Sequence, residues 1–172
     1  MSRSSSSDYM AFNDFQKHCP ECKKGEPCKK PHVYALELRK EILQKGWFTD
    51  ANPDYVKGKM CLYVGETGHL PKCRASAHQF CKRKAKAWEG KKYRCYCDGE
   101  EGWRSCTKFS RGAKDKVARH NKFTLRPKLF KRIRDKDGNN LGNPIQDPGK
   151  RKEQEERLAL HLRSLGYGVW YG

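Results

Sequence analysis

The sequence predicts a small α/β domain with loop insertions, and three features indicate this class. Two short runs, 32–38 (HVYALEL) and 60–65 (MCLYVG), have the length and the aromatic and β-branched content of strands. Residues 151–166 (RKEQEERLALHLRSLG) place leucines at helical spacing and end in glycine. Of the 172 residues, 35% are hydrophobic and 34% are charged, so we expect a modest core that carries long polar segments.

The N-terminal segment, residues 1–17, is serine-rich, and we expect it to be a disordered tail. It has no apolar stretch typical of a secretory signal. No run in the chain approaches the roughly 20 apolar residues that cross a bilayer. We therefore expect a cytoplasmic protein with no membrane partner, in which the nine cysteines are reduced and disulfides do not form.

Residues 18–31 are rich in cysteine and lysine and form a candidate zinc knuckle. Cys19 and Cys22 have the two-residue gap with which two thiolates bind one tetrahedral Zn²⁺, and Cys28 follows them. The alternatives for a fourth ligand are His32, His18 and a cysteine of the segment 95–106. Because that segment holds Cys95, Cys97 and Cys106, one composite site and two separate sites both stay open.

The remaining elements follow from local signals along the chain. The run 60–65 is apolar almost throughout, so we place it at the centre of the sheet. A helix is expected from about Lys72 to Trp88, because Pro71 suits a first helical turn and several alanines follow. A third strand is expected within 122–127 (KFTLRP), and 167–172 (YGVWYG) closes the chain as a short strand. In the segment after the first strand, a short helix could begin, but Gly46 breaks it into loop.

The net charge is +18, because 38 Lys and Arg outweigh 20 Asp and Glu. So large an excess repels itself unless a polyanion balances it. We expect DNA as the partner, since each phosphate that is neutralised releases counterions and adds affinity. Basic residues are interleaved with Trp88, Tyr93, Tyr96 and Trp103, and the run 126–134 (RPKLFKRIR) suits contact with a phosphate backbone.

Two tyrosine-containing triplets in strands, an arginine-bearing helix and a late glutamate-bearing helix occur in this order. The residues are His32-Val33-Tyr34, Tyr63-Val64-Gly65, Arg74 and Glu155. This order resembles the GIY-YIG nuclease family over residues 32–170, and the Arg74–His78 pair looks most like its restriction-enzyme branch. The resemblance implies a nuclease domain over 32–172, with insertions at about 40–58 and 89–122. It further implies a central three-stranded mixed or antiparallel sheet flanked by helices.

The resemblance also implies a metal-dependent DNA endonuclease that hydrolyses phosphodiester bonds. Glu155 would hold Mg²⁺ or Mn²⁺, since its spacing from Leu158 and Leu162 puts it on the inward helix face; Glu156 is the fallback. Arg74 would clamp the phosphate through its fork of donors. One turn later, His78 lies on the same face and would bind a phosphate oxygen or move a proton.

Tyr34 and Tyr63 would lie on adjacent strands, and the resemblance implies that one of them activates or orients the attacking water. The residues expected to bind the substrate are Gly65, His69 and Lys72. The cysteines of the expected core elements, Cys61, Cys73 and Cys81, are interpreted as packing residues. The alternative function is a zinc-stabilised nucleic-acid-binding protein without catalysis.

Overall fold

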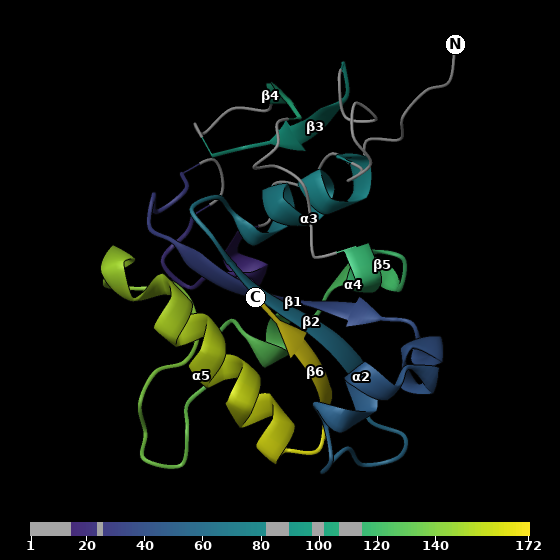
Figure 1. Ribbon diagram of the computed structural model, residues 1–172. Coiled ribbons are helices and arrows are strands. Elements are labelled where there is room, and N and C mark those ends of the chain that lie inside the picture. The colour runs from purple at the N-terminus through teal and green to yellow at the C-terminus, as the bar shows by residue number, and fades with distance from the viewer. Residues whose placement is uncertain (1–14, 24–25, 82–89, 98–101, 107–114) are drawn as a thin grey trace.

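The computed structural model describes residues 15–23, 26–81, 90–97, 102–106 and 115–172 (Figure 1). The strands are β1 (His32–Leu38), β2 (Cys61–Thr67), β3 (Lys92–Cys95), β4 (Gly102–Ser105), β5 (Asn121–Leu125) and β6 (Gly168–Tyr171). The α-helices are α2 (Gly46–Asp50), α3 (Pro71–Phe80), α4 (Asp115–Ala118) and α5 (Arg151–Ser164). The 3-10 helices are η1 (Phe15–Lys17), η2 (Lys40–Gln44), η3 (Pro127–Leu129) and η4 (Pro148–Lys150). No helix among these residues is long and apolar enough to span a bilayer.

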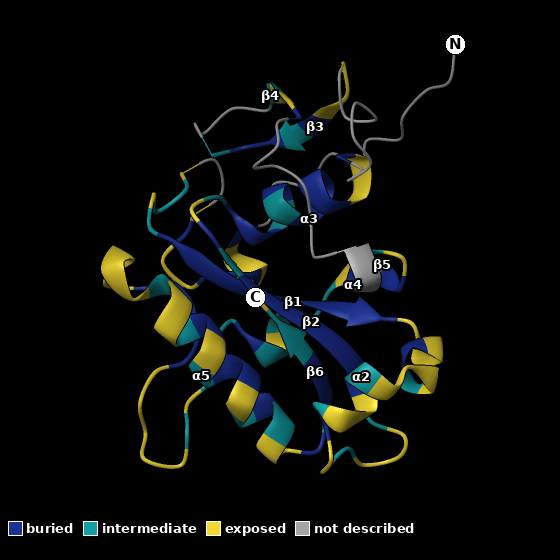
Figure 2. Cartoon of the chain, viewed as in Figure 1, coloured by how far each residue is buried: buried dark blue, intermediate teal, exposed yellow. Residues whose placement is uncertain are grey.

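The main sheet is mixed and has four strands in the order β5-β1-β2-β6, where we expected three. Both the 122–127 segment and the last strand of the chain join it, which accounts for the additional strand. β1 pairs with β2 in antiparallel register over its whole length, and β6 lies parallel to the other edge of β2. All residues of β1 are buried, as Figure 2 shows, and Tyr63 of β2 is buried as well, so the tyrosines of both expected triplets lie in the core.

Helix α5 follows the predicted boundaries and packs beside β2 and β6 (Figure 1). Its buried residues are Glu155, Leu158, Ala159 and Leu162. Leu165 does not continue this face, because it follows the last helical turn and is 46% exposed. Gly166 then adopts a φ of +85°, which ends the helix as expected.

Helix α3 begins at Pro71 and ends at Phe80, where we expected it to begin at about Lys72 and continue to Trp88. The backbone N–H of Cys81 caps it by donating to the carbonyl of Ala77, and residues 82–89 lie outside the described part of the chain. The helix contacts β1 and β5 of the main sheet and the β3–β4 hairpin (Figure 1). It therefore lies between two sheets, which brings its side chains close to both.

Two segments expected to be irregular are ordered by buried aromatic and aliphatic side chains. Residues 40–58 contain η2 and α2, which are anchored by the fully buried Ile42 and Phe48. Gly46 begins α2 and does not break the segment into loop. The expected tail, 1–17, ends in η1, because Phe15 is buried edge-on against Tyr96 with 5.6 Å between ring centroids.

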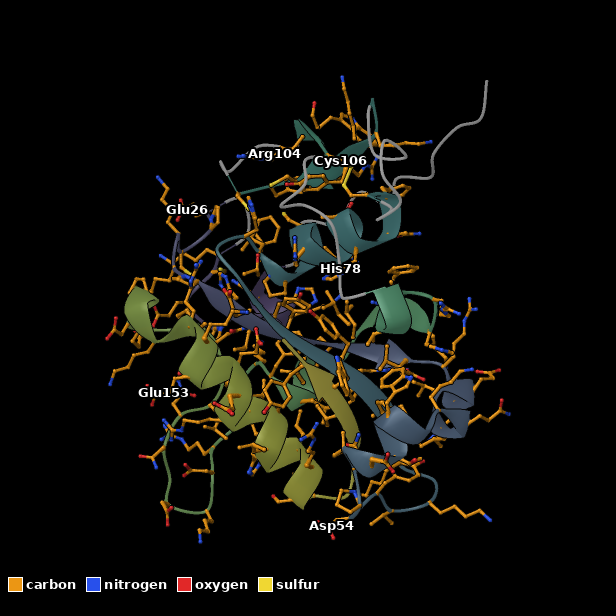
Figure 3. All side chains as sticks on the ribbon, viewed as in Figure 1. Glu26, Asp54, His78, Arg104, Cys106 and Glu153 are labelled. Carbon is orange, nitrogen blue, oxygen red and sulfur yellow. A yellow bond between two sulfur atoms is a disulfide. The ribbon has the colours of Figure 1, made fainter. Side chains whose placement is uncertain are left out.

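A disulfide joins Cys81 and Cys106, which corrects the expectation of no disulfides and of Cys81 as a packing residue. The end of α3 and the end of β4 bring the two Cα atoms within 5.4 Å, a separation that a disulfide spans. Figure 3 shows Cys106 beside the hairpin. Sequence spacing could not reveal this pair, because the contact depends on how the hairpin packs against the helix.

Candidate active site and metal-binding cluster

Tyr34 and Gly65 stand opposite each other in the β1–β2 register. A Cβ atom at Gly65 would lie 2.4 Å from the Tyr34 phenol oxygen and 2.5 Å from the carbon that bears it. The phenol therefore lies directly over the Gly65 backbone, and a residue with a side chain cannot take this position unless Tyr34 moves. Gly65 thus has a role beyond ending the Tyr63-Val64-Gly65 triplet, because it leaves the space that the Tyr34 phenol occupies.

The Tyr34 hydroxyl lies 2.8 Å from Nε2 of His78, on the helix above it (Figure 3). The ring of Tyr63 completes a three-ring cluster, with centroids 6.1 Å from Tyr34 and 5.6 Å from His78. Arg74 lies one helical turn before His78, and its charge acts on the Tyr34 phenol. The structure thus brings four of the five expected catalytic side chains into direct proximity.

Burial sets the protonation of this cluster. It lowers the pKa of His78 well below 6.5, and the charge of Arg74 acts in the same direction, so the imidazole is neutral. Burial also raises the pKa of Tyr34, although Arg74 opposes this effect. At neutral pH the pair therefore consists of a phenol and a neutral imidazole. A nitrogen of such an imidazole can accept the phenol proton when the other nitrogen carries the hydrogen.

The pKa of His78 leads to a prediction about stability. The unfolded chain, with an imidazole pKa near 6.5, binds this proton more readily than the folded chain. The contribution of His78 to the free energy of unfolding should therefore be fully present above about pH 6.5. It should decrease as the pH is lowered below that value. In urea denaturation between about pH 5 and 8, His78→Gln should reduce this slope and His161→Gln should keep it. Equal slopes in His78→Gln and wild type would count against the assignment.

Two carboxylates lie close together next to the three-ring cluster. Glu155 of α5 is 3% exposed, and the backbone of Glu66 in β2 acts to lower the pKa of its carboxyl group. The Lys152 ammonium bridges both acids, at 3.3 Å from Glu155 Oε2 and 3.5 Å from Glu66 Oε1. Arg151 adds a contact of 3.5 Å to Glu66 Oε2. Two acids that share one cation are suited in charge and atom type to a hard divalent ion.

Glu155 therefore lies on the inward helix face, as its spacing predicted, and its charge acts on both Tyr34 and Tyr63. Burial raises the pKa of Glu155, Lys152 opposes this, and the charge of Glu66 adds to it. The fallback residue, Glu156, is exposed and accepts a hydrogen bond of 3.2 Å from the Tyr171 hydroxyl. Glu66 was not identified beforehand, although its position directly after Tyr63-Val64-Gly65 was a usable signal.

The candidate zinc knuckle brings together one set of four ligand atoms, those of Cys19, Cys22, Cys28 and His32. All four lie within 4.8 Å of one another. Measured pairs are 3.8 Å (Cys19 to Cys28), 3.7 Å (Cys22 to His32) and 3.5 Å (Cys28 to His32). A zinc tetrahedron with Zn–S of about 2.3 Å and Zn–N of about 2.0 Å has edges of roughly 3.5 to 3.8 Å. The cluster could therefore hold a structural metal ion, and among the alternatives for the fourth position it contains His32.

The knuckle is tied to the sheet through Asn143, which sequence reasoning did not select. The Asn143 side chain accepts from the Val33 backbone N–H at 2.7 Å and donates to the Val33 carbonyl at 2.9 Å. The same amide donates to the His18 carbonyl at 2.8 Å. It thus satisfies both backbone groups of a β1 residue and holds the start of the knuckle beside Tyr34.

The residues expected to bind substrate do not all lie in the cluster. Gly65 does, whereas His69 has its Nδ1 atom 3.3 Å from the Cys97 sulfur. Lys72 lines a cavity of about 670 Å³ between α3, the hairpin and β5, together with Arg94 and Trp103. Of the aromatic residues interleaved with the basic segments, Trp103 is 59% exposed, Tyr93 and Tyr96 are buried, and Trp88 lies outside the described residues.

Comparison with known proteins identified no relative: no family model matches the chain, and neither a curated protein nor a solved structure resembles it significantly.

Proposed function

We propose that this chain is a metal-dependent DNA endonuclease of the GIY-YIG type, which hydrolyses phosphodiester bonds. One observation carries the proposal: Tyr34, Tyr63, Arg74, His78 and Glu155 were selected from sequence order alone, and they converge on one cluster. They come from two strands and two helices that are distant in the chain.

In the reaction, the oxygen of a water molecule bonds to phosphorus, one P–O ester bond breaks, and the departing oxygen takes up a proton. The water must lose a proton, and the Tyr34–His78 pair is suited to accept it. Tyr34 would take the proton from water while its own hydroxyl proton passes to the neutral His78 over the 2.8 Å contact. Arg74 would stabilise the added negative charge on the phosphate and favour the phenolate character of Tyr34.

The metal would be Mg²⁺ or Mn²⁺, held by Glu155 with Glu66 beside it. Oxygen ligands from carboxylates suit these hard ions, and the Lys152 ammonium already indicates a position between the two acids that favours a cation. A bound divalent ion would act as a Lewis acid on the phosphate. Lys152 and Arg151 are 71% and 42% exposed, so they can turn toward a DNA phosphate when the acids gain another cation.

The knuckle would hold Zn²⁺ in a structural role, because its four positions are all taken by protein ligands and leave none open for a reactant. The cavity beside α3 would extend the DNA surface. Lys72 and Arg94 supply positive charge there, and the Arg94 guanidinium lies 5.5 Å from the centroid of the exposed Trp103 ring. Basic and aromatic groups in one cavity suit phosphate contact and base stacking.

A second candidate function is a zinc-stabilised protein that binds nucleic acid without cutting it. The observation that favours it is the burial of the cluster: Tyr34, Tyr63 and Glu155 are 1%, 5% and 3% exposed. For cleavage, the Arg151 and Lys152 side chains, which form ion pairs with Glu66, would have to move away from the carboxylates. Binding through the basic surface requires no such movement.

The test is to incubate the full chain with supercoiled plasmid in Mg²⁺, in Mn²⁺ and in EDTA. Wild type should nick or linearise the plasmid with either ion and should be inactive in EDTA. Tyr34→Phe should lower the rate about 10²- to 10⁴-fold, since it removes the group that takes the proton. Tyr55→Phe, outside the cluster, should match wild type. Binding of DNA with no cleavage under any of these conditions would favour the second candidate over the nuclease.

A further inference from the structure

A second group of sulfur and imidazole ligands lies between α3 and the β3–β4 hairpin. His69 comes from the loop before α3, and Cys95 and Cys97 lie at the end of β3. Their three ligand atoms lie within 4.8 Å of one another, and the closest measured pair is His69 Nδ1 to Cys97 Sγ, at 3.3 Å. The His69 backbone N–H donates to the Thr67 hydroxyl at 3.0 Å, which holds the loop in place.

Cys73 lies beside this group and offers a third sulfur and a fourth ligand. Its side chain packs in the same buried cluster as the side chains of Cys95 and Cys97. Its sulfur also accepts from the Tyr96 backbone N–H at 3.0 Å, so it faces the turn between those two cysteines. Cys73 is fully buried in the first turn of α3.

The surroundings of these sulfurs suit metal ligation better than packing. Backbone N–H groups point at two of them: Tyr96 at Cys73, and Leu70 at Cys97 at 3.4 Å. The knuckle shows the same feature, because the Cys28 N–H donates to the Cys22 sulfur at 3.4 Å. Such hydrogen bonds stabilise the negative charge of a bound thiolate. Cysteines that serve only as packing residues have no need of an imidazole nitrogen directed at them.

We propose that His69, Cys73, Cys95 and Cys97 bind a second zinc ion, separate from the one in the knuckle. Three thiolates and one imidazole form a tetrahedral structural zinc set with no open position. This assignment gives His69 a structural role in place of contact with substrate, and it makes Cys73 a ligand as well as a buried residue. The proposal does not depend on nuclease activity.

The two clusters are joined by one hydrogen bond. Nδ1 of His32, whose Nε2 faces the knuckle sulfurs, lies 3.1 Å from the carbonyl oxygen of His69. A histidine that ligates through one nitrogen commonly donates its other N–H to such a carbonyl, which sets the tautomer. The second ion would also hold the first turn of α3, in which Arg74 follows Cys73 directly. Arg74 would thus be oriented by a metal site outside the catalytic cluster.

The test is the zinc content of the purified full chain, measured by mass spectrometry together with protein concentration. We expect about two zinc ions per chain in wild type and about one in Cys73→Ser, Cys97→Ser or Cys22→Ser. Combining Cys73→Ser with Cys22→Ser should leave close to none. Cys61→Ala removes a cysteine in β2 that belongs to neither cluster, and it should retain about two.

Replacing zinc with Co²⁺ in the wild-type protein counts the metal sites without depending on the folding of any variant. The thiolate-to-metal absorption should increase up to about two equivalents of Co²⁺, and X-ray absorption of the zinc form should indicate about three sulfurs and one nitrogen per ion. One ion per chain in wild type would overturn the proposal. A Cys73→Ser variant that keeps two ions while Cys97→Ser loses one would overturn the assignment of Cys73. Either result can be read whether or not the protein cuts DNA.

Discussion

Replacing Glu155 with glutamine is expected to lower the rate of DNA cleavage by about 10³-fold or more in Mg²⁺. Glutamine keeps the shape of the side chain, but it lacks the charge that would hold a divalent ion. The protein should remain folded. Burial already raises the pKa of Glu155, so removal of its charge should leave the melting temperature equal or higher.

Glu156→Gln is the matched control, because it makes the same change at the next position of the same helix, on the exposed side. It should cut plasmid at the wild-type rate. The measurements are initial cleavage rates over a range of Mg²⁺ concentrations and thermal melts of all three proteins. If Glu155→Gln cleaves as fast as wild type, the assignment of Glu155 as a metal ligand is wrong, whatever the control shows.

Replacing Gly65 with alanine is expected to disturb both stability and activity through a single contact. The added methyl group would lie 2.4 Å from the Tyr34 oxygen, so the tyrosine must move and its 2.8 Å contact with His78 is lost. We expect a loss of about 1–3 kcal/mol in the free energy of unfolding, as for other overpacked cores. Cleavage should fall about 10²- to 10⁴-fold, as for loss of the proton acceptor.

Two controls separate this clash from the general cost of altering a glycine. Gly46, at the start of α2, has open space where a Cβ would lie, so Gly46→Ala should stabilise the protein by about 0.4–1 kcal/mol. In a Tyr34→Ala background, where the clashing ring is absent, Gly65→Ala should cost less than about 0.5 kcal/mol in urea denaturation. If the cost stayed the same in both backgrounds, the clash with Tyr34 would not be its cause.

Elements with strong local signals could be predicted from the sequence. The boundaries of β1 match the apolar run 32–38, and the inward direction of Glu155 follows from its spacing to Leu158 and Leu162. In both cases a single element determines the pattern, because strand length and helical period are local properties. Cys19, Cys22 and Cys28 were found for the same reason, since their ligand spacing lies within one short segment.

Features that depend on contacts between distant segments could not be predicted. Glu66 is important only because α5 brings Glu155 beside it, and Cys73 joins its cluster only because the hairpin folds onto α3. The 81–106 disulfide has the same origin, since it links two elements that no sequence pattern places together. The four-stranded sheet was not predicted, because the strand signals at 121–125 and 168–171 do not reveal that these segments pair with the free edges of β1 and β2.

The pairing of β6 with β2 has a consequence for the newly synthesised protein. Glu155 reaches the cluster of Tyr34, Tyr63 and His78 only when α5 is held against the sheet, and β6 completes the edge of that sheet beside β2. Synthesis proceeds at about 5–20 residues per second, so the roughly 80 residues between Arg74 and Glu155 take about 4–16 s. During this interval the basic segments have emerged while the two carboxylates are still apart. With the proposed function, a nascent chain would meet nucleic acid, including the RNA that surrounds it, before it is able to cut.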